Sequence, residues 1–97
     1  MVHLGILARM EAKPGKEDEV GAFLESALSL VQEEPDTVTW YAIRISPSEF
    51  GIFDTFEEDA GRQAHLSGKV AEALMAKAPD LFVSTPDIQT VDILAAK

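Results

Sequence analysis

The sequence contains no cysteine and no asparagine, and it has only two histidines, His3 and His65. Without cysteine there can be no disulfide framework, no thiolate nucleophile and no zinc ribbon. Two histidines are too few for an imidazole-rich metal site within one chain. We therefore expect no metal.

Basic residues and long apolar runs are also scarce. Eight Lys and Arg residues face 17 Asp and Glu residues, which gives a net charge of −9 at pH 7. Such a surface repels phosphate backbones and anionic lipids, so we expect neither nucleic acid nor a membrane as a partner. No apolar run approaches the ~18 residues of a membrane span, and no signal peptide is recognisable. The sequence favours a cytoplasmic protein.

What the sequence does contain is typical of one globular domain covering residues 1–97, with 46% hydrophobic residues. Alternating apolar residues predict strands, and apolar residues at spacings of three and four predict helices. The expected strands are residues 2–11, 37–45, 49–56 and 88–94; the expected helices are 17–34 and 57–78, the second interrupted at Ser67-Gly68, where Ser67 is a candidate N-cap, and ending at Pro79. This β-α-β-β-α-β order predicts an α+β, ferredoxin-like fold with a four-stranded antiparallel sheet.

The predicted sheet has two apolar faces, although its helices can cover only one. We place the apolar side of residues 2–11 (Val2, Leu4, Ile6, Ala8, Met10) under the helices, together with Tyr41, Ile43, Ile45, Phe53, Val91 and Ile93. The opposite face then carries His3, Gly5, Leu7, Arg9, Val38, Trp40, Ala42, Arg44, Phe50, Ile52, Asp54, Phe56, Ile88, Thr90, Asp92 and Leu94. Soluble monomers rarely expose so large an apolar patch, which predicts a homodimer with an interface of ~2,000 Å² or more.

Several short motifs resemble the antibiotic biosynthesis monooxygenase (ABM) superfamily. They are Ala12-Lys13-Pro14-Gly15-Lys16-Glu17, Glu34-Pro35-Asp36-Thr37, Phe53-Asp54-Thr55-Phe56-Glu57-Glu58 and Ala64-His65-Leu66. Their order and spacing are similar to the family pattern over nearly the whole chain. The resemblance implies a dimeric α/β barrel with a pocket between sheet and helices. It also implies cofactor-independent oxidation of quinols, anthrones or similar activated aromatics by O₂. The haem-degrading branch of the family uses an asparagine, and this chain has none.

Two residues are the main candidates for catalysis. His65 matches the family histidine and could act as a base or bind substrate, or it could simply bond a carbonyl at a helix end. Asp54 lies between aromatic residues, and its removal from water suits a proton acceptor. Alternatively, Asp54 forms a buried ion pair with Arg9 or Arg44. His3 is the remaining candidate base.

The other site candidates would bind the substrate. Trp40 could stack on a planar ligand or belong to the core, and it lies opposite Asp54 if the hairpin pairs Ile45 with Glu49. Arg9 and Arg44 could stabilise an oxyanion or form interface salt bridges. The remaining predicted substrate-binding residues are Phe50, Ile52 and Phe56.

Two functions of different classes follow. One is a small monooxygenase acting on a hydroxylated aromatic or quinol. The other is a non-catalytic dimeric barrel that binds a small apolar ligand or serves as a scaffold. The second predicts that the candidate bases are fully paired and that the cavity is either small or filled by Phe50, Phe53, Phe56 and Trp40.

Overall fold

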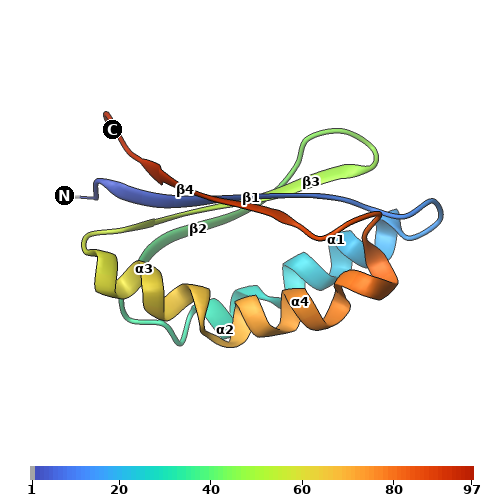
Figure 1. Ribbon diagram of the computed structural model, residues 1–97, viewed down its shortest axis with the longest axis horizontal. Helices are drawn as coiled ribbons and strands as arrows, with labels where there is room; N and C mark the ends of the chain where they lie inside the picture. The colour runs from blue at the N-terminus through green and yellow to red at the C-terminus, as the bar shows by residue number, and fades with distance from the viewer. Residues whose placement is uncertain (1) are drawn as a thin grey trace.

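The computed structural model describes residues 2–97, which form one four-stranded antiparallel sheet and four helices (Figure 1). The strands are β1 (Leu4–Glu11), β2 (Thr37–Arg44), β3 (Glu49–Phe56) and β4 (Asp87–Asp92). The helices are α1 (Glu17–Ser26), α2 (Leu28–Val31), α3 (Asp59–Leu66) and α4 (Lys69–Leu81). The strand order across the sheet is β2-β3-β1-β4, so the predicted ferredoxin-like fold is confirmed.

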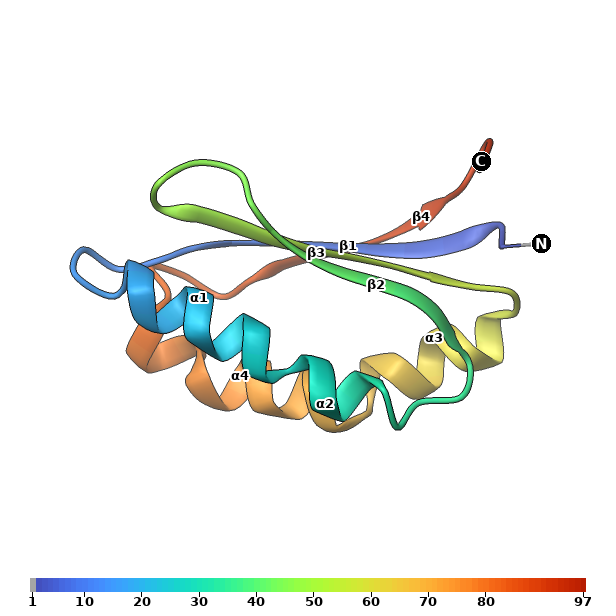
Figure 2. The ribbon, with the colours of Figure 1, turned by 180° about the vertical axis from the view of Figure 1, so that it is seen from behind.

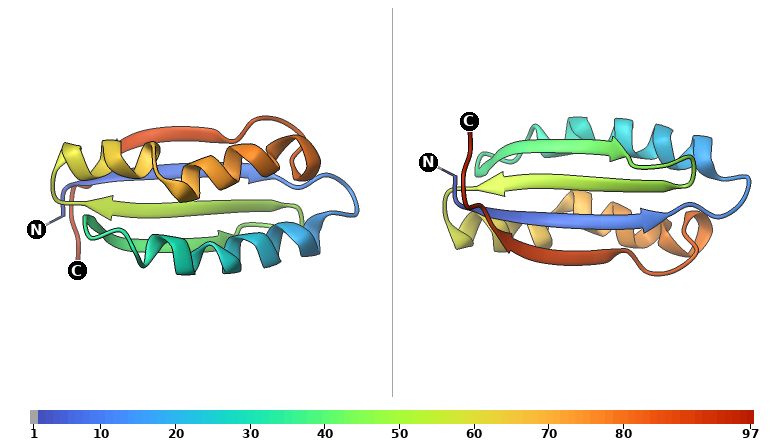
Figure 3. Two further views of the ribbon diagram at one scale, coloured as in Figure 1. Left: turned by 90° about the horizontal axis from the view of Figure 1, so that it is seen from below. Right: turned by 90° about the horizontal axis from the view of Figure 1, so that it is seen from above.

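The molecule has two layers. All four helices pack against one face of the sheet, as Figure 1 and the reverse view in Figure 2 show. Figure 3 shows the helices lying lengthwise over the strands when seen from below, and the uncovered strands when seen from above. No helix within residues 2–97 is both long enough and apolar enough to span a membrane.

Strand register decides which residues lie under the helices. Ile6, Ala8 and Met10 of β1 lie directly opposite Asp54, Ile52 and Phe50 of β3, and directly opposed residues share a face. The main core comprises Ala8, Met10, Ala12, Val20, Leu24, Phe50, Ile52, Leu74, Ala78, Leu81 and Phe82. Burial of this apolar set against α1 and α4 is the main stabilisation of the fold.

The sequence-based face assignment is correct for β1 and wrong for the other three strands. Trp40, Ala42 and Arg44 of β2 pair with Asp54, Ile52 and Phe50 of β3, which places both sets on the helix side. The same correction applies to Ile88, Thr90 and Asp92 of β4, which pair with alternate residues of β1. The reason is the two-residue period of a strand, because a register error of one residue exchanges its two faces.

The outer face of the sheet is nevertheless apolar, but with different residues. Tyr41 and Ile43 are 56% and 43% exposed, and Leu7, Phe53 and Val91 share their face. We call this set of residues the outer apolar face.

The helices differ from the sequence prediction at three points. The chain tightens at Ala27, whose N–H is shared by the carbonyls of Phe23 and Leu24, and this separates α1 from α2. The predicted stop at Pro79 is wrong, because α4 continues to Leu81. The predicted N-cap role of Ser67 is also wrong, because its hydroxyl donates backwards to the Gln63 carbonyl at the end of α3.

Candidate functional site

A buried polar cluster lies at the end of the helix–sheet layer where α3 covers the sheet. Asp54 comes from β3, His65 from α3, Glu34 from the connection between α2 and β2, and Thr37 from the start of β2. Asp54 and His65 are only 1% and 7% exposed, and the Glu34 side chain is 20% exposed. Three separate parts of the fold, a strand, a helix and a connection, thus bring two carboxylates to one imidazole.

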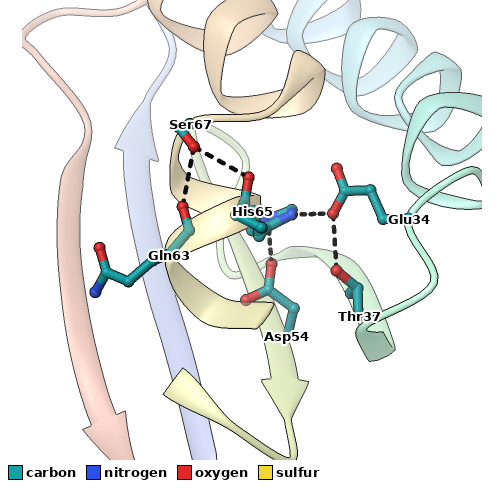
Figure 4. Close-up of polar contacts among 7 residues, drawn as sticks. Glu34, Thr37, Asp54, Gln63, His65 and Ser67 are labelled. Atoms are coloured by element: carbon teal, nitrogen blue, oxygen red, sulfur yellow. Dashed lines mark hydrogen bonds and ion pairs between the residues drawn. The ribbon is translucent and has the colours of Figure 1, made fainter. Parts of the chain in front are cut away.

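His65 is bonded on both sides of its ring (Figure 4). Its Nδ1 lies 2.5 Å from Glu34 Oε1, and its Nε2 lies 2.9 Å from Asp54 Oδ2. The hydroxyl of Thr37 donates to the same Glu34 oxygen at 2.7 Å. The result is a continuous carboxylate–imidazole–carboxylate chain, which we call the Glu34–His65–Asp54 chain.

The protonation state of His65 follows from these partners. Carboxylate oxygens accept hydrogen bonds, so both ring nitrogens must carry protons if each is to donate. Burial by itself lowers the pKa of His65, but the hydrogen bonds and charges of Asp54 and Glu34 outweigh it and raise that pKa above its usual 6.5. The chain in this form holds two negative charges and one positive charge.

Two aromatic residues border the chain. The ring of the fully buried Phe56 lies 5.5 Å from that of His65, at 44° to it. Trp40 lies directly opposite Asp54, and the Ile45 N–H donates to the Glu49 carbonyl, so the predicted hairpin register is confirmed. Trp40 also packs against both apolar clusters of the interior, which agrees with the core alternative for this residue.

A cavity of about 300 Å³ opens beside this chain. His65, Glu34 and Thr37 line it, together with the small residues Gly61, Ala64 and Gly68 and the apolar Leu30 and Pro35. Glu33, Asp36 and Lys69 complete the lining. Asp54 does not line this cavity. Of the three residues in the Glu34–His65–Asp54 chain, only Glu34 and His65 can therefore contact a molecule bound there.

Four of the predicted site residues lie elsewhere. Arg9 pairs with Glu49 at 3.7 Å on the exposed outer side, and Arg44 lies 4.9 Å above the ring of Phe50. Neither arginine pairs with Asp54, so that alternative is wrong. Phe50 and Ile52 belong to the apolar core, and neither lines the cavity.

Sequence reasoning missed Glu34 and Thr37 as functional residues. Both stand in the Glu34-Pro35-Asp36-Thr37 segment, which was interpreted only as a family motif and a helix end. A carboxylate and a hydroxyl three residues apart, between a helix and a strand, were the available signal. Their contact with His65 spans 31 residues along the chain and requires the fold to be known. Among residues 2–97, no group of three or more His, Asp and Glu side chains is arranged to hold a metal ion.

No protein-family model and no curated protein matches this sequence. A solved protein of unknown function from Nitrosomonas europaea is 50% identical, with a TM-score of 0.97. That match covers 100% of this chain and 94% of the other. The chain belongs to the same family as this Nitrosomonas europaea protein.

More distant solved structures carry the name of a superfamily. A candidate antibiotic biosynthesis monooxygenase from Caulobacter crescentus has a TM-score of 0.79 at 16% identity, covering 97% of this chain and 92% of that one. Another, from Chloroflexus aurantiacus, has a TM-score of 0.74 at 19% identity, covering 98% and 96%. The chain has the same fold as these two proteins. At these identities the likeness shows the fold alone, and it confirms the fold that the sequence resemblance implied.

Proposed function

We propose that this protein is a cofactor-independent monooxygenase that oxidises a small hydroxylated aromatic or quinol with O₂. The observation that carries the proposal is the Glu34–His65–Asp54 chain, buried beside a cavity large enough for one small ring. The ABM-superfamily fold supports it, because solved proteins named for that activity share this architecture.

The reaction requires only proton removal and O₂. An anthrone, for example, loses a proton from its activated CH₂ group and gives a stabilised carbanion. This anion transfers an electron to O₂, and recombination of the two radicals forms a peroxide anion. The peroxide anion takes back the proton that was removed and becomes a hydroperoxide. Loss of water then leaves a carbonyl, so one oxygen atom of O₂ enters the product and the other leaves as water.

The residues of this chain supply the proton acceptor. His65 in its doubly protonated form cannot accept a further proton, so the proton passes to a carboxylate. The His65 cation then offsets the negative charge that develops on the substrate and the charge that the other carboxylate keeps. Phe56 excludes water from the inner side of the imidazole, which strengthens these interactions.

We also propose that a second copy of the chain covers the outer apolar face. Ile52, which the sequence-based face assignment placed there, is buried under the helices and cannot test this interface. Ile43→Asp is the appropriate variant, because an unpaired charge between two sheets is strongly unfavourable. Sedimentation of the wild type at micromolar concentration should give a dimer and Ile43→Asp a monomer. A stable wild-type monomer would refute the interface.

One observation favours the alternative of a non-catalytic binding protein. Both nitrogens of His65 already have partners, as that alternative predicts, although the cavity itself is open. In this case the Glu34–His65–Asp54 chain would fix the connection between α2 and β2 against α3, and the cavity would only hold a ligand.

Oxygen consumption distinguishes the two functions. A panel of quinols and anthrones is screened with an oxygen electrode, with and without added flavin. The monooxygenase proposal predicts flavin-independent uptake with at least one substrate and its loss in Asp54→Asn, which keeps the shape of the side chain. No uptake with any compound that binds would favour the alternative, and uptake only in the presence of flavin would contradict the cofactor-independent mechanism.

A further inference from the structure

The two carboxylates of the Glu34–His65–Asp54 chain occupy different positions. Asp54 is 1% exposed and lies outside the cavity lining, whereas Glu34 lines the cavity beside His65. A bound molecule can therefore reach the chain from the Glu34 side. The deeper carboxylate acts on it only through the imidazole.

The two oxygens of Glu34 also differ. Oε1 accepts from both Thr37 and His65, which uses both of its lone pairs. Oε2 is buried and has no hydrogen-bond partner among the described residues, and a Cβ placed on Gly68 would lie 3.3 Å from it. A buried carboxylate oxygen without a donor is costly, so a ligand N–H or O–H at this position gains more than it would in water. Thr37 and His65 together fix which oxygen is offered.

The charges around the cavity select the ligand further. The lining contains three acidic residues, Glu33, Glu34 and Asp36, and one basic residue, Lys69. The doubly protonated His65 also lines the cavity, and Asp54 lies just behind it. With four acidic and two basic groups around it, an anion entering the cavity meets net negative charge, while a neutral or cationic group meets no repulsion. The remaining walls are apolar or small, which suits a flat ring.

We propose that this cavity binds aromatic ligands that donate a hydrogen bond to Glu34 Oε2 and carry no negative charge, and that it excludes aromatic carboxylates. Glu34 is the specificity-determining residue. The inference deepens the proposed function, because such a ligand would be its substrate, but binding can occur whether or not turnover follows.

The test measures binding of three phenols of similar size to the full chain under nitrogen, so that no oxidation occurs. The probes are tyramine, which is cationic, 4-ethylphenol, which is neutral, and 4-hydroxyphenylacetate, which is anionic. Amide chemical shifts followed by NMR give both the affinity and the location. We expect tyramine and 4-ethylphenol to perturb Thr37, Gly61 and Gly68, and the anion to bind roughly tenfold more weakly or not at all.

Two variants and one control sharpen the result. Glu34→Gln keeps the side-chain shape and should reduce the preference for tyramine over the anion by about fivefold or more. Lys69→Met removes the exposed cation of the rim and should increase that preference. Glu25→Gln on α1 lies outside the cavity and should leave the preference unchanged.

Three results would overturn the inference. The first is an anion that binds as tightly as tyramine, and the second is a preference that Glu34→Gln does not alter. The third is failure of all three probes to perturb the cavity residues at millimolar concentration. Each concerns binding without O₂, so it is separate from the oxygen-uptake result. A protein that binds these phenols selectively but consumes no O₂ would retain this inference and lose the proposed monooxygenase activity.

Discussion

The helix-facing side of the sheet has two ends of opposite character. At one end Met10, Phe50, Leu81 and Phe82 form a closed apolar core. At the other end the same strand, β3, contributes Asp54, which is even less exposed than Phe50 yet binds an imidazole. The two ends share one sheet, one register and one helix layer, so the difference lies in side-chain chemistry alone.

The apolar end stabilises the fold, whereas the polar end costs stability. Burying a Phe side chain stabilises a protein by about 1.5–3 kcal/mol, whereas burying an ion costs several kcal/mol that its partners only partly offset. The polar end also leaves Asp54 Oδ1 and Glu34 Oε2 buried without hydrogen-bond partners in the part of the chain described here. Apolar residues would stabilise this end more, so its polar chain indicates a function.

The apolar end should show the largest effect on stability. Phe82→Ala removes a fully buried ring and should lower the free energy of unfolding by about 3–5 kcal/mol. Urea denaturation measures the loss. Oxygen uptake by the folded fraction should be unchanged, because Phe82 lies outside the cavity beside His65. A variant that lost activity while folded would couple the two ends.

The polar end should show the largest effect on turnover. Asp54→Asn and His65→Gln should each lower turnover of an active substrate by ~10²-fold or more, the usual scale for loss of acid–base catalysis, because each breaks the Glu34–His65–Asp54 chain. The apolar-end variant Leu74→Ala serves as the matched control, because it loses stability in the main core while the Glu34–His65–Asp54 chain is left intact. Turnover unaffected by both polar changes would remove the Glu34–His65–Asp54 chain from the mechanism.

The polar end alone should respond to pH near neutrality. Because the folded state raises the pKa of His65 above 6.5, its contribution to stability is complete below about pH 6.5 and is lost as pH rises through the raised pKa. The free energy of unfolding should therefore fall over this range in the wild type. In His65→Gln this fall should disappear. Both proteins retain His3, so the difference between their pH curves belongs to position 65.

The smallest effect concerns the hydroxyl that fixes Glu34. Thr37→Val keeps the branched shape and removes one hydrogen bond, so the free energy of unfolding should fall by about 0.5–1.5 kcal/mol. The affinity for tyramine should fall as well, because Glu34 loses its second anchor. Thr39→Val, which breaks the Thr39–Thr55 bond at the other side of the sheet, is the control and should leave tyramine binding unchanged.

The apolar end was largely predictable from the sequence. The alternation of Ile6, Ala8 and Met10 indicates a strand with one buried side, and the spacing of Val20 and Leu24 indicates the helix that covers it. These local patterns give the order of elements, and with it the ferredoxin-like topology. The faces of the other three strands were not predictable, because they depend on register, which no local pattern determines.

The polar end was predictable only in part. His65 stood out because it matches the histidine of the family motif, and Asp54 stood out as an acidic residue between aromatics. In the folded protein His65 Nε2 lies 2.9 Å from Asp54 Oδ2. Glu34 did not stand out, since a glutamate before a proline is also the ordinary end of a helix. Only the packing of the α2–β2 connection against α3 makes it the third member of the chain.

Replacing all three residues of the Glu34–His65–Asp54 chain tests the central claim, that the polar end serves function and the apolar end serves stability. The triple variant Glu34→Leu/Asp54→Leu/His65→Leu should be at least as stable as the wild type, and up to about 1–4 kcal/mol more stable, because apolar residues often replace buried ion networks favourably. It should neither bind tyramine nor consume O₂ with any substrate of the wild type. A triple variant that is several kcal/mol less stable in urea denaturation, or that still binds tyramine, would contradict the claim.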